Sequence, residues 1–450
     1  MSKNIVLRKG LNIPISGVAD LQACGVVVPD VVAVKPTDFR GLVPRLLVRE
    51  GDKVLAGSPV LADKERPDIL YASPVSGTVA AVVRGAKRKL LEVRIRRDSV
   101  QEYVDFGKKD VASLDAAQVK DALMKGGLWP AIIQRPYGVT ANPEVSPKGI
   151  FVSAFATAPL AANLDFALGD QLDYIQVGID ALARIAPVHL SLSTKPSVFS
   201  SLKNVTQHVF KASKHPAGNV GVQISHISPI MKGDTVWTVS LLMLAAIGKL
   251  FKNGKYDLRR KVAITGPMAI SPCYVETVPG MAMTDLAPFY GSYDGEMRFV
   301  SGDPLSGTSV GKEGYLGFFD NQVTLLHEGT EREWLGWCNP FRFKLFSSNH
   351  AYFHWLLPCP KKTYDLDTNY HGGERTFMMT DVYGKVLPMD IYPLYLIKAC
   401  ITGNIDDMEK YGIYEVLPED FATVEFTDPS KNDIQEIISK GIALMMKEMA

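Results

Sequence analysis

A short glycine-rich turn is the first feature of the sequence that could do chemistry. The run Lys125–Pro130 contains Gly126 and Gly127, with Trp129 directly before the proline. A glycine-rich turn that opens toward a helix can hold a phosphate, because backbone N–H groups and the helix dipole both face the anion. A plain loop would use two adjacent glycines as well. The turn alone therefore leaves a nucleotide site and a plain loop open.

Lys64 is a second candidate, as the attachment point of a swinging-arm cofactor. It lies within 26–97, where short β-branched runs alternate with turn residues, a spacing typical of compact all-β structure. The glycine- and proline-containing turns at 50–57 and 73–79 resemble those of a biotinyl/lipoyl-type barrel-sandwich. Arg66-Pro67-Asp68 follows the lysine and fits the carrier pattern loosely. We therefore expect an unmodified barrel, with a lipoyl or biotinyl carrier protein as the alternative.

The histidines do not form a recognisable catalytic or metal-binding pattern. His350 and His354 stand four apart, as zinc ligands on a helix do, but Ala351 takes the place of the general base. His215 and His226 have no acid or nucleophile at a useful spacing, so we expect them to be capping or core histidines. No catalytic residue and no metal site is predicted.

The composition predicts several domains and a reducing compartment. A chain of 450 residues fits two to four domains. The 49 basic and 48 acidic residues nearly cancel, so we expect no nucleic-acid partner. The five cysteines are scattered without metal or disulfide spacing, and the N-terminus lacks the apolar region of a signal peptide.

The pattern of the elements changes along the chain. We expect N-terminal strands and the barrel in 1–100, alternating helices and strands of an α/β domain in 101–258, β structure again in 259–330, and an aromatic segment followed by helices in 331–450. A helix over 116–125 can be capped by Ser113 or Asp115. The longest apolar stretch, 236–248, is too short to span a membrane and predicts a buried core helix.

The glycine turn resembles a degraded copy of the Gly-Gly-Ala-Gly-Phe-Pro flavin loop found in respiratory complex I and in the C-subunit of the Rnf complex. In those relatives an Ala-Glu-Cys-Glu-Pro segment places two carboxylates against the nucleotide. The matching stretch here, 155–159, keeps the proline but has Ala156 and Ala158 in place of both acids. Leu128 and Trp129 also add bulk where the loop should approach phosphate. We therefore expect a Rossmann-like domain that binds neither NADH nor FMN.

Longer segments select one family among these relatives. The runs 215–221, 224–227, 236–239 and 247–251 resemble the A-subunit of the Na+-translocating NADH:quinone oxidoreductases, and the resemblance covers nearly the whole chain from Ile5 onward. It implies a complex that reduces ubiquinone to ubiquinol with NADH and exports Na+. In that family FAD, FMN, riboflavin and the iron–sulfur centre belong to other subunits. The A-subunit is peripheral, on the cytoplasmic face of the bacterial inner membrane against a membrane subunit. An Rnf-type electron-transfer subunit is the alternative.

The last two regions also resemble parts of these relatives. Residues 259–330 resemble a ubiquitin-like β-grasp module of the soluble-ligand-binding type. The tail resembles the region that binds iron–sulfur clusters, but it offers only Cys400, whereas a cluster needs about four cysteine thiolates.

Two roles for the chain itself remain open. Trp129, Tyr137 and Phe155 could line an apolar cleft that binds quinone in the emptied nucleotide site. Alternatively the same aromatics fill the cavity and the chain is a cofactor-free scaffold. Because no polar pair is visible to hold the quinone carbonyls, we favour the scaffold.

Overall fold

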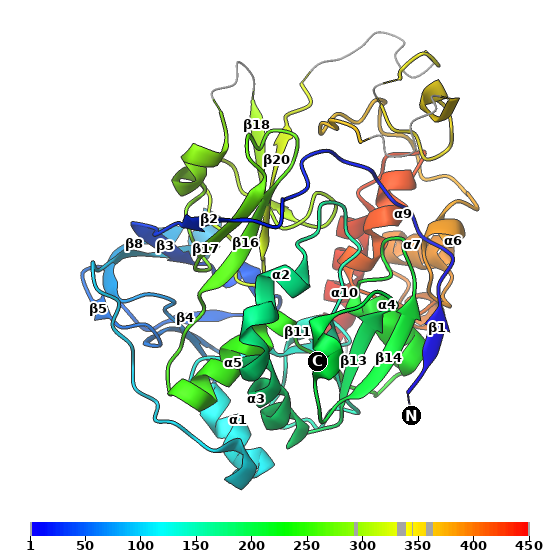
Figure 1. Ribbon diagram of the computed structural model, residues 1–450. Coiled ribbons are helices and arrows are strands. Elements are labelled where there is room, and N and C mark those ends of the chain that lie inside the picture. The colour runs from blue at the N-terminus through cyan, green and yellow to red at the C-terminus, as the bar shows by residue number, and fades with distance from the viewer. Residues whose placement is uncertain (1, 292–295, 331–338, 344, 357–362, 449–450) are drawn as a thin grey trace.

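The chain is described by a computed structural model that covers residues 2–291, 296–330, 339–343, 345–356 and 363–448 (Figure 1). Much of the aromatic segment predicted after 331, including Trp334 and Trp337, lies outside the described residues, as does the side chain of His354. The strands of the described residues, β1 to β20, form four sheets, and the C-terminal part is helical.

The barrel-sandwich consists of two small sheets. One has the order β3-β9-β8-β5 and the other β4-β6-β7. Alternate residues point inward, so that Val32, Val60 and Ile95 are completely buried between the sheets. The strands are β3 (Val31–Val34), β4 (Pro44–Leu46), β5 (Lys53–Val54), β6 (Pro59–Asp63), β7 (Leu70–Ala72), β8 (Gly77–Arg84) and β9 (Leu90–Arg97).

The α/β domain is built on a seven-stranded sheet of order β1-β14-β13-β12-β15-β10-β11. The first five strands in this order are parallel. At the other end β10 is antiparallel to β15, and β11 is antiparallel to β10. The strands are β1 (Asn4–Val6), β10 (Ile133–Arg135), β11 (Val139–Thr140), β12 (Ile150–Ser153), β13 (Val188–Ser193), β14 (Thr206–Lys211) and β15 (Val236–Thr238).

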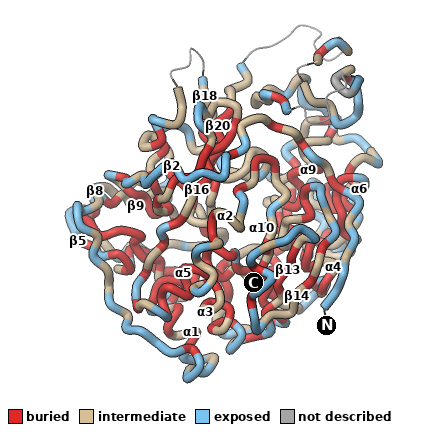
Figure 2. The backbone as a smooth tube through the Cα atoms, in the orientation of Figure 1, coloured by how far each residue is buried: buried red, intermediate tan, exposed pale blue. Residues whose placement is uncertain are grey.

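Helices cover both faces of this sheet. Along β12, Ile150 and Val152 belong to one core cluster and Phe151 to another, because successive side chains point to opposite faces. The first face carries α1 (Ala116–Lys125), α2 (Leu164–Leu168), α3 (Leu172–Ala183) and α5 (Leu241–Asn253). The second face packs against α4 (Val220–Ile227) and the C-terminal helices, and Figure 2 shows the buried residues concentrated between these layers.

The predicted helix over 116–125 is α1, and the predicted helix over 236–248 is wrong in its first part. Asp115 caps α1 by accepting a hydrogen bond from the Gln118 amide at 2.8 Å. The apolar run instead divides into strand β15 and helix α5, which begins after Ser240. The division arises because a continuous apolar run suits a buried strand as well as a buried helix, and the Ser240 side chain caps the helix at the Met243 amide.

A third sheet has the β-grasp arrangement. Its order is β19-β18-β20-β16-β17-β2, with the parallel pair β16 and β20 in the centre. The β16–β17 hairpin is antiparallel, as is β18 to β20. The strands are β2 (Ala23–Val26), β16 (Arg260–Thr265), β17 (Cys273–Thr277), β18 (Met297–Ser301), β19 (Thr308–Ser309) and β20 (Gln322–His327).

The N-terminal segment links three of the four sheets. From β1 it crosses the molecule to β2, which pairs with β17, before entering the barrel at β3 (Figure 1). Cys24 of β2 forms a disulfide with Cys273 of β17. The sequence spacing, read as free of any disulfide pattern and typical of a reducing compartment, missed this pair, because the two residues are 249 positions apart and only the sheet brings them together.

The C-terminal region packs as helices on the second face of the α/β sheet. Ile438 and Ile442 of α10 are buried in the same cluster as Phe151 of β12. The helices are α6 (Tyr383–Val386), α7 (Pro393–Thr402), α8 (Ile405–Lys410), α9 (Ala422–Thr427) and α10 (Ile434–Glu448). Throughout the described residues, no helix combines the length and apolar character needed to cross a membrane.

Candidate functional site

The carboxyl edge of the α/β sheet is where a ligand would be expected. From β12 the chain continues to β13 on one side, while β15 lies on the other side. In open parallel sheets, ligands bind at such a switch point, outside the carboxyl ends of the strands. The glycine turn lies at this edge, because β10, which follows it, pairs Ile133 with Thr238 at the end of β15.

The glycine turn ends a helix instead of opening one. Gly126 is the C-terminal cap of α1, and the chain continues through the single 3₁₀ turn Trp129–Ala131 into β10. The amides of Gly126, Gly127 and Leu128 donate to carbonyls within α1, at 2.9, 3.1 and 3.0 Å. Pro130 has no N–H to offer. These amides are therefore not available as a cradle for phosphate.

Both glycines are needed for close packing against neighbouring elements. A Cβ on Gly126 would lie 2.5 Å from the Leu250 side chain of α5, and one on Gly127 would lie 2.7 Å from Ala72 of the barrel. Gly127 also has φ +68°, which other residues rarely adopt. The residues of this turn do not fit a flavin phosphate, and they pack the α/β domain onto the barrel instead.

The segment that replaces the acidic motif binds the chain itself. The Thr157 hydroxyl accepts a hydrogen bond from the Gly218 amide at 2.8 Å and lies 3.3 Å from Nδ1 of His215. The Ser153 hydroxyl donates to the Gly218 carbonyl at 3.1 Å and accepts from Nε2 of Gln223 at 2.8 Å. The loop after β12 is thus tied to the loop before α4.

The N-terminal segment covers this part of the edge. The Leu11 amide donates to the His215 carbonyl at 2.8 Å, and Ile13 and Ile15 pack with Leu160. His215 is 3 % exposed, and burial lowers its pKa, opposed by Asp303 and Asp420. His215 is thus a core histidine, as predicted.

A buried ionic network fills the N-terminus of α4. Arg135 of β10 is 2 % exposed, and its guanidinium lies 3.2 Å from Asp420 and 3.1 Å from Glu419. Asp420 is completely buried, lies against Gly221 in the first turn of α4, and accepts from the Asn219 amide group at 3.3 Å. A helix N-terminus favours an anion, and here the carboxylate of the chain takes that position.

The three aromatic residues predicted to line a quinone cleft lie on different faces of the sheet. Trp129 is completely buried on the first face, against Trp237, and its indole N–H donates to the Ala141 carbonyl at 2.7 Å. Tyr137 and Phe155 are partly buried on the second face. The structure therefore brings Tyr137 and Phe155 to one cluster and separates Trp129 from both.

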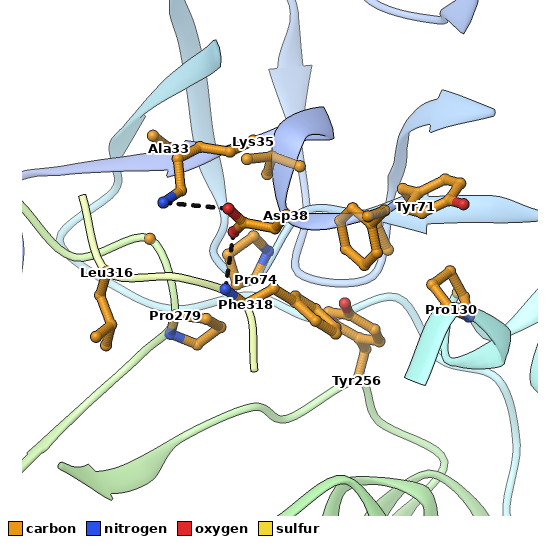
Figure 3. A pocket seen from close by; sticks show the side chains of 15 residues that line it. Ala33, Lys35, Asp38, Tyr71, Pro74, Pro130, Tyr256, Pro279, Leu316 and Phe318 are labelled. Atoms are coloured by element: carbon orange, nitrogen blue, oxygen red, sulfur yellow. Dashed lines mark hydrogen bonds and ion pairs between the residues drawn. The ribbon is translucent and has the colours of Figure 1, made fainter. Parts of the chain in front are cut away.

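Sequence reasoning missed a small cavity between the barrel, the glycine turn and the β-grasp domain. Its volume is about 20 Å³, which is space for roughly one or two water molecules. Gly127 and Pro130 line it, and Figure 3 shows Asp38 bonded to Lys35 and to the Phe318 amide at its wall. The distances are 3.2 and 2.8 Å. Burial raises the pKa of Asp38, and the Lys35 ammonium opposes that effect.

Lys64, His226 and Cys400 have the surroundings of surface or structural residues. Lys64 is exposed in the loop between β6 and β7, where its amide donates to the Val43 carbonyl. His226 bonds the Pro388 carbonyl at 2.7 Å, as expected of a capping or core histidine. Burial raises the pKa of Cys400 to about 12, so its thiol is protonated. Within the described part of the chain, no three His, Cys, Asp or Glu side chains gather as metal ligands would.

Comparison with known proteins supports the folds assigned above. One family model, described as the NqrA N-terminal barrel-sandwich hybrid domain, matches 5–98, and another, the NqrA second alpha/beta domain, matches 114–256. Both predicted folds are thereby confirmed.

Relatives match over almost the entire length. A protein of Rhodopirellula baltica, named as the A-subunit of a Na(+)-translocating NADH-quinone reductase, is 33 % identical over 449 residues, 98 % of either chain. A protein of that name from Pasteurella multocida is 34 % identical over 451 residues, 99 % of this chain and 100 % of its own. A crystal structure of an NAD+-reducing NiFe-hydrogenase aligns with a TM-score of 0.34 and 13 % identity over 47 % of either chain, a likeness too low to support an inference.

Proposed function

Because the chain belongs to the NqrA family, the A-subunits of Na+-translocating NADH-quinone reductases, we propose that it is the cofactor-free scaffold of such a complex. The family places the chain among the subunits of a sodium-translocating oxidoreductase that uses NADH and quinone. In our proposal the complex reduces ubiquinone to ubiquinol and couples this to Na+ export. The chain is peripheral, on the cytoplasmic face of the inner membrane, and is held there by a membrane subunit.

The filled glycine turn is the observation that carries the scaffold role. The amides of Gly126, Gly127 and Leu128 donate to carbonyls of α1. The side chains of Leu250 and Ala72 lie against the two glycines. Ala156 and Ala158 offer no carboxylates. A flavin would have to break these hydrogen bonds and separate the α/β domain from the barrel. In this proposal the α/β domain keeps the fold of a nucleotide-binding domain but serves as a packing surface. It connects the barrel, the β-grasp domain and the C-terminal helices.

Quinone binding by this chain is the second candidate, and the placement of the aromatics weakens it. Phe155 and Tyr137 pack at the edge of the second core cluster, where a quinone ring could lie against them. Trp129 is on the other face and completely buried, so it cannot form the third wall without unfolding of the core. We therefore favour the scaffold.

Reconstitution tests the proposal. Membranes that hold the other subunits of the complex but lack this chain would be mixed with the purified chain, and NADH-driven quinone reduction and Na+ uptake would be measured. We expect both activities to return with a chain that carries no flavin. Recovery that requires prior loading of the chain with FMN would contradict the proposal.

A further inference from the structure

A tyrosine-lined groove lies on the C-terminal domain, away from the glycine turn. It is bounded by the turn after α4, the segment before α7, and α8 with the residues that follow it. Its volume is about 480 Å³, within the range of roughly 300–1,000 Å³ found for ligand-binding pockets. Its lining includes the carboxylates of Asp390, Asp406, Glu409 and Glu415 and the rings of Tyr392 and Tyr411.

Exposed aromatic rings gather at this groove. Tyr392 is 65 % exposed and Tyr395 is 46 % exposed. Their ring centroids lie 6.2 and 5.5 Å from that of Tyr411. Tyrosine is enriched in the residues that dominate protein–protein binding energy. Met231, 64 % exposed, adds an apolar side chain to the lining. A set of large side chains left in water in this way fits a surface that a partner covers.

The basic residues of the groove are already engaged. Both ammonium–carboxylate contacts of Lys232 are to Glu409, at 2.7 and 2.9 Å, and the Tyr414 hydroxyl donates to the same carboxylate. The Lys410 ammonium lies 5.5 Å from the centre of the Tyr411 ring. Four carboxylate residues and two lysines line the groove, so acidic groups outnumber basic ones there.

Three carboxylates have no cation of their own among the described residues. Asp390 and Asp406 are exposed, and Glu415 is half-buried. Burial and, to a smaller extent, the charge of neighbouring Asp390 raise the pKa of Glu415 to about 7. Asp390 and Glu415 thus line the same groove, and neither has an ion pair among the described residues. A cationic group that entered the groove would stabilise the ionised form of Glu415 against both its desolvation and its repulsion by Asp390.

We propose that this groove docks a basic loop of the membrane-embedded partner subunit, with a lysine or arginine side chain between the tyrosine rings and the free carboxylates. Loops of membrane proteins on the cytoplasmic side carry an excess of Lys and Arg, which gives the partner the complementary charge. An ammonium or guanidinium group gains from aromatic faces and from charge-assisted hydrogen bonds to carboxylates. The inference rests on the proposed function, in which a membrane subunit holds this chain.

The test is binding of the purified full-length chain to membranes that contain the other subunits but lack this one. Asp390→Asn combined with Glu415→Gln, and separately Tyr392→Ala, should each weaken sedimentation with these membranes by about tenfold or more. A hexa-arginine peptide should compete with the wild type, and a hexa-glutamate peptide should not. Asp390 and Tyr392 are exposed, and Glu415→Gln keeps the shape of a half-buried side chain, so these variants should keep the thermal unfolding midpoint of the wild type.

Matched variants outside the groove control for the loss of two carboxylates and for the loss of an aromatic ring. Asp121→Asn combined with Glu436→Gln removes two exposed carboxylates elsewhere, and Tyr370→Ala removes a ring that is 54 % exposed. Both should bind like the wild type. If the groove variants also bind like the wild type, the docking inference is overturned and the scaffold role stands.

Two further outcomes would overturn the inference. Failure of the wild type itself to bind these membranes would remove both the docking site and the proposed function. Equal binding to protein-free vesicles of anionic lipid would show that lipid, and not a basic protein loop, holds the chain.

Discussion

Replacing Asp420 with asparagine should loosen the C-terminal helices from the α/β domain. The carboxylate is completely buried and accepts three hydrogen bonds, from Arg135 at 3.2 Å, from Asn219 at 3.3 Å and from the Leu417 amide at 3.1 Å. Arg135 and Asn219 belong to the α/β domain, whereas Asp420 precedes α9. The carboxylate therefore joins the two parts of the chain directly.

The expected cost follows from the burial of Arg135. With Asp420 neutral, the guanidinium keeps the Glu415 carbonyl at 3.4 Å and one carboxylate, Glu419, whose side chain is 40 % exposed and so offers a weaker contact. Removing one partner of a buried pair typically costs about 3–5 kcal/mol, because the other charge remains in a poorly solvated place. Asparagine keeps the shape and one acceptor oxygen, so we expect a loss near the lower end, about 3 kcal/mol.

Native-state hydrogen exchange can measure this loss where it should occur. The opening free energy of the α10 amides, Ile434–Glu448, should fall by about 3 kcal/mol in Asp420→Asn, while the β-grasp strands change little. Asp121→Asn is the matched control, because it breaks an ion pair whose side chains are 72 % and 50 % exposed. That variant should cost less than about 0.5 kcal/mol.

A double replacement separates the charge from the packing. Arg135→Met combined with Asp420→Leu removes both charges and should recover at least half of the loss, since apolar replacements of buried pairs are often neutral. If Asp420→Asn changes α10 no more than Asp121→Asn does, this network does not fasten the C-terminal domain and the reasoning is refuted.

Three other changes test separate parts of the structure. His208 is 1 % exposed and lies 3.0 Å from His189, and burial followed by the charges of His189 and the N-terminus lowers its pKa to about 4. The unfolded state, with a pKa of about 6.5, binds the proton first as pH falls, so stability is full near pH 7 and should drop by about 2 kcal/mol by pH 5 in urea titrations. In His208→Asn this pH-dependent loss should largely disappear, and an unchanged loss would contradict the assignment. Trp129→Ala should lower the free energy of unfolding by about 3–5 kcal/mol without changing the affinity for a quinone analogue, and a change confined to affinity would favour the quinone cleft. Intact-protein mass spectrometry of the chain purified from cells should find Lys64 unmodified, whereas a lipoyl or biotinyl adduct would establish the carrier alternative.

The parts of the fold that depend on local pattern could be predicted from the sequence. The β-branched runs located the barrel strands, and the capping residue Asp115 with helical spacing located α1. The prediction of one helix over 236–248 is wrong because apolar side chains are buried in β15 and in α5 alike, and only Ser240 marks the boundary.

The parts that depend on distant partners could not be predicted. Arg135 and Asp420 are 285 positions apart, and nothing in either neighbourhood indicates the other. The same holds for β1 and β2, which join the α/β and β-grasp sheets instead of the adjacent barrel. For the candidate site, the replacement of both acids by Ala156 and Ala158 was visible in the sequence. That Gly127 packs against Ala72, and that Trp129 faces away from Phe155, required the sheet to be assembled.

Titration of the purified chain with FMN is the decisive test of a filled nucleotide site. Trp129 follows the glycine turn and packs against Trp237, so tryptophan fluorescence reports on any ligand that opens this region. NADH and a water-soluble ubiquinone analogue would be titrated alongside, with Phe155→Ala as the variant for the quinone. We expect no saturable response to FMN or NADH, because the Gly126, Gly127 and Leu128 amides donate within α1 and Ala156 and Ala158 replace the two carboxylates. Saturable, stoichiometric FMN binding that Gly127→Val abolishes would contradict a filled site.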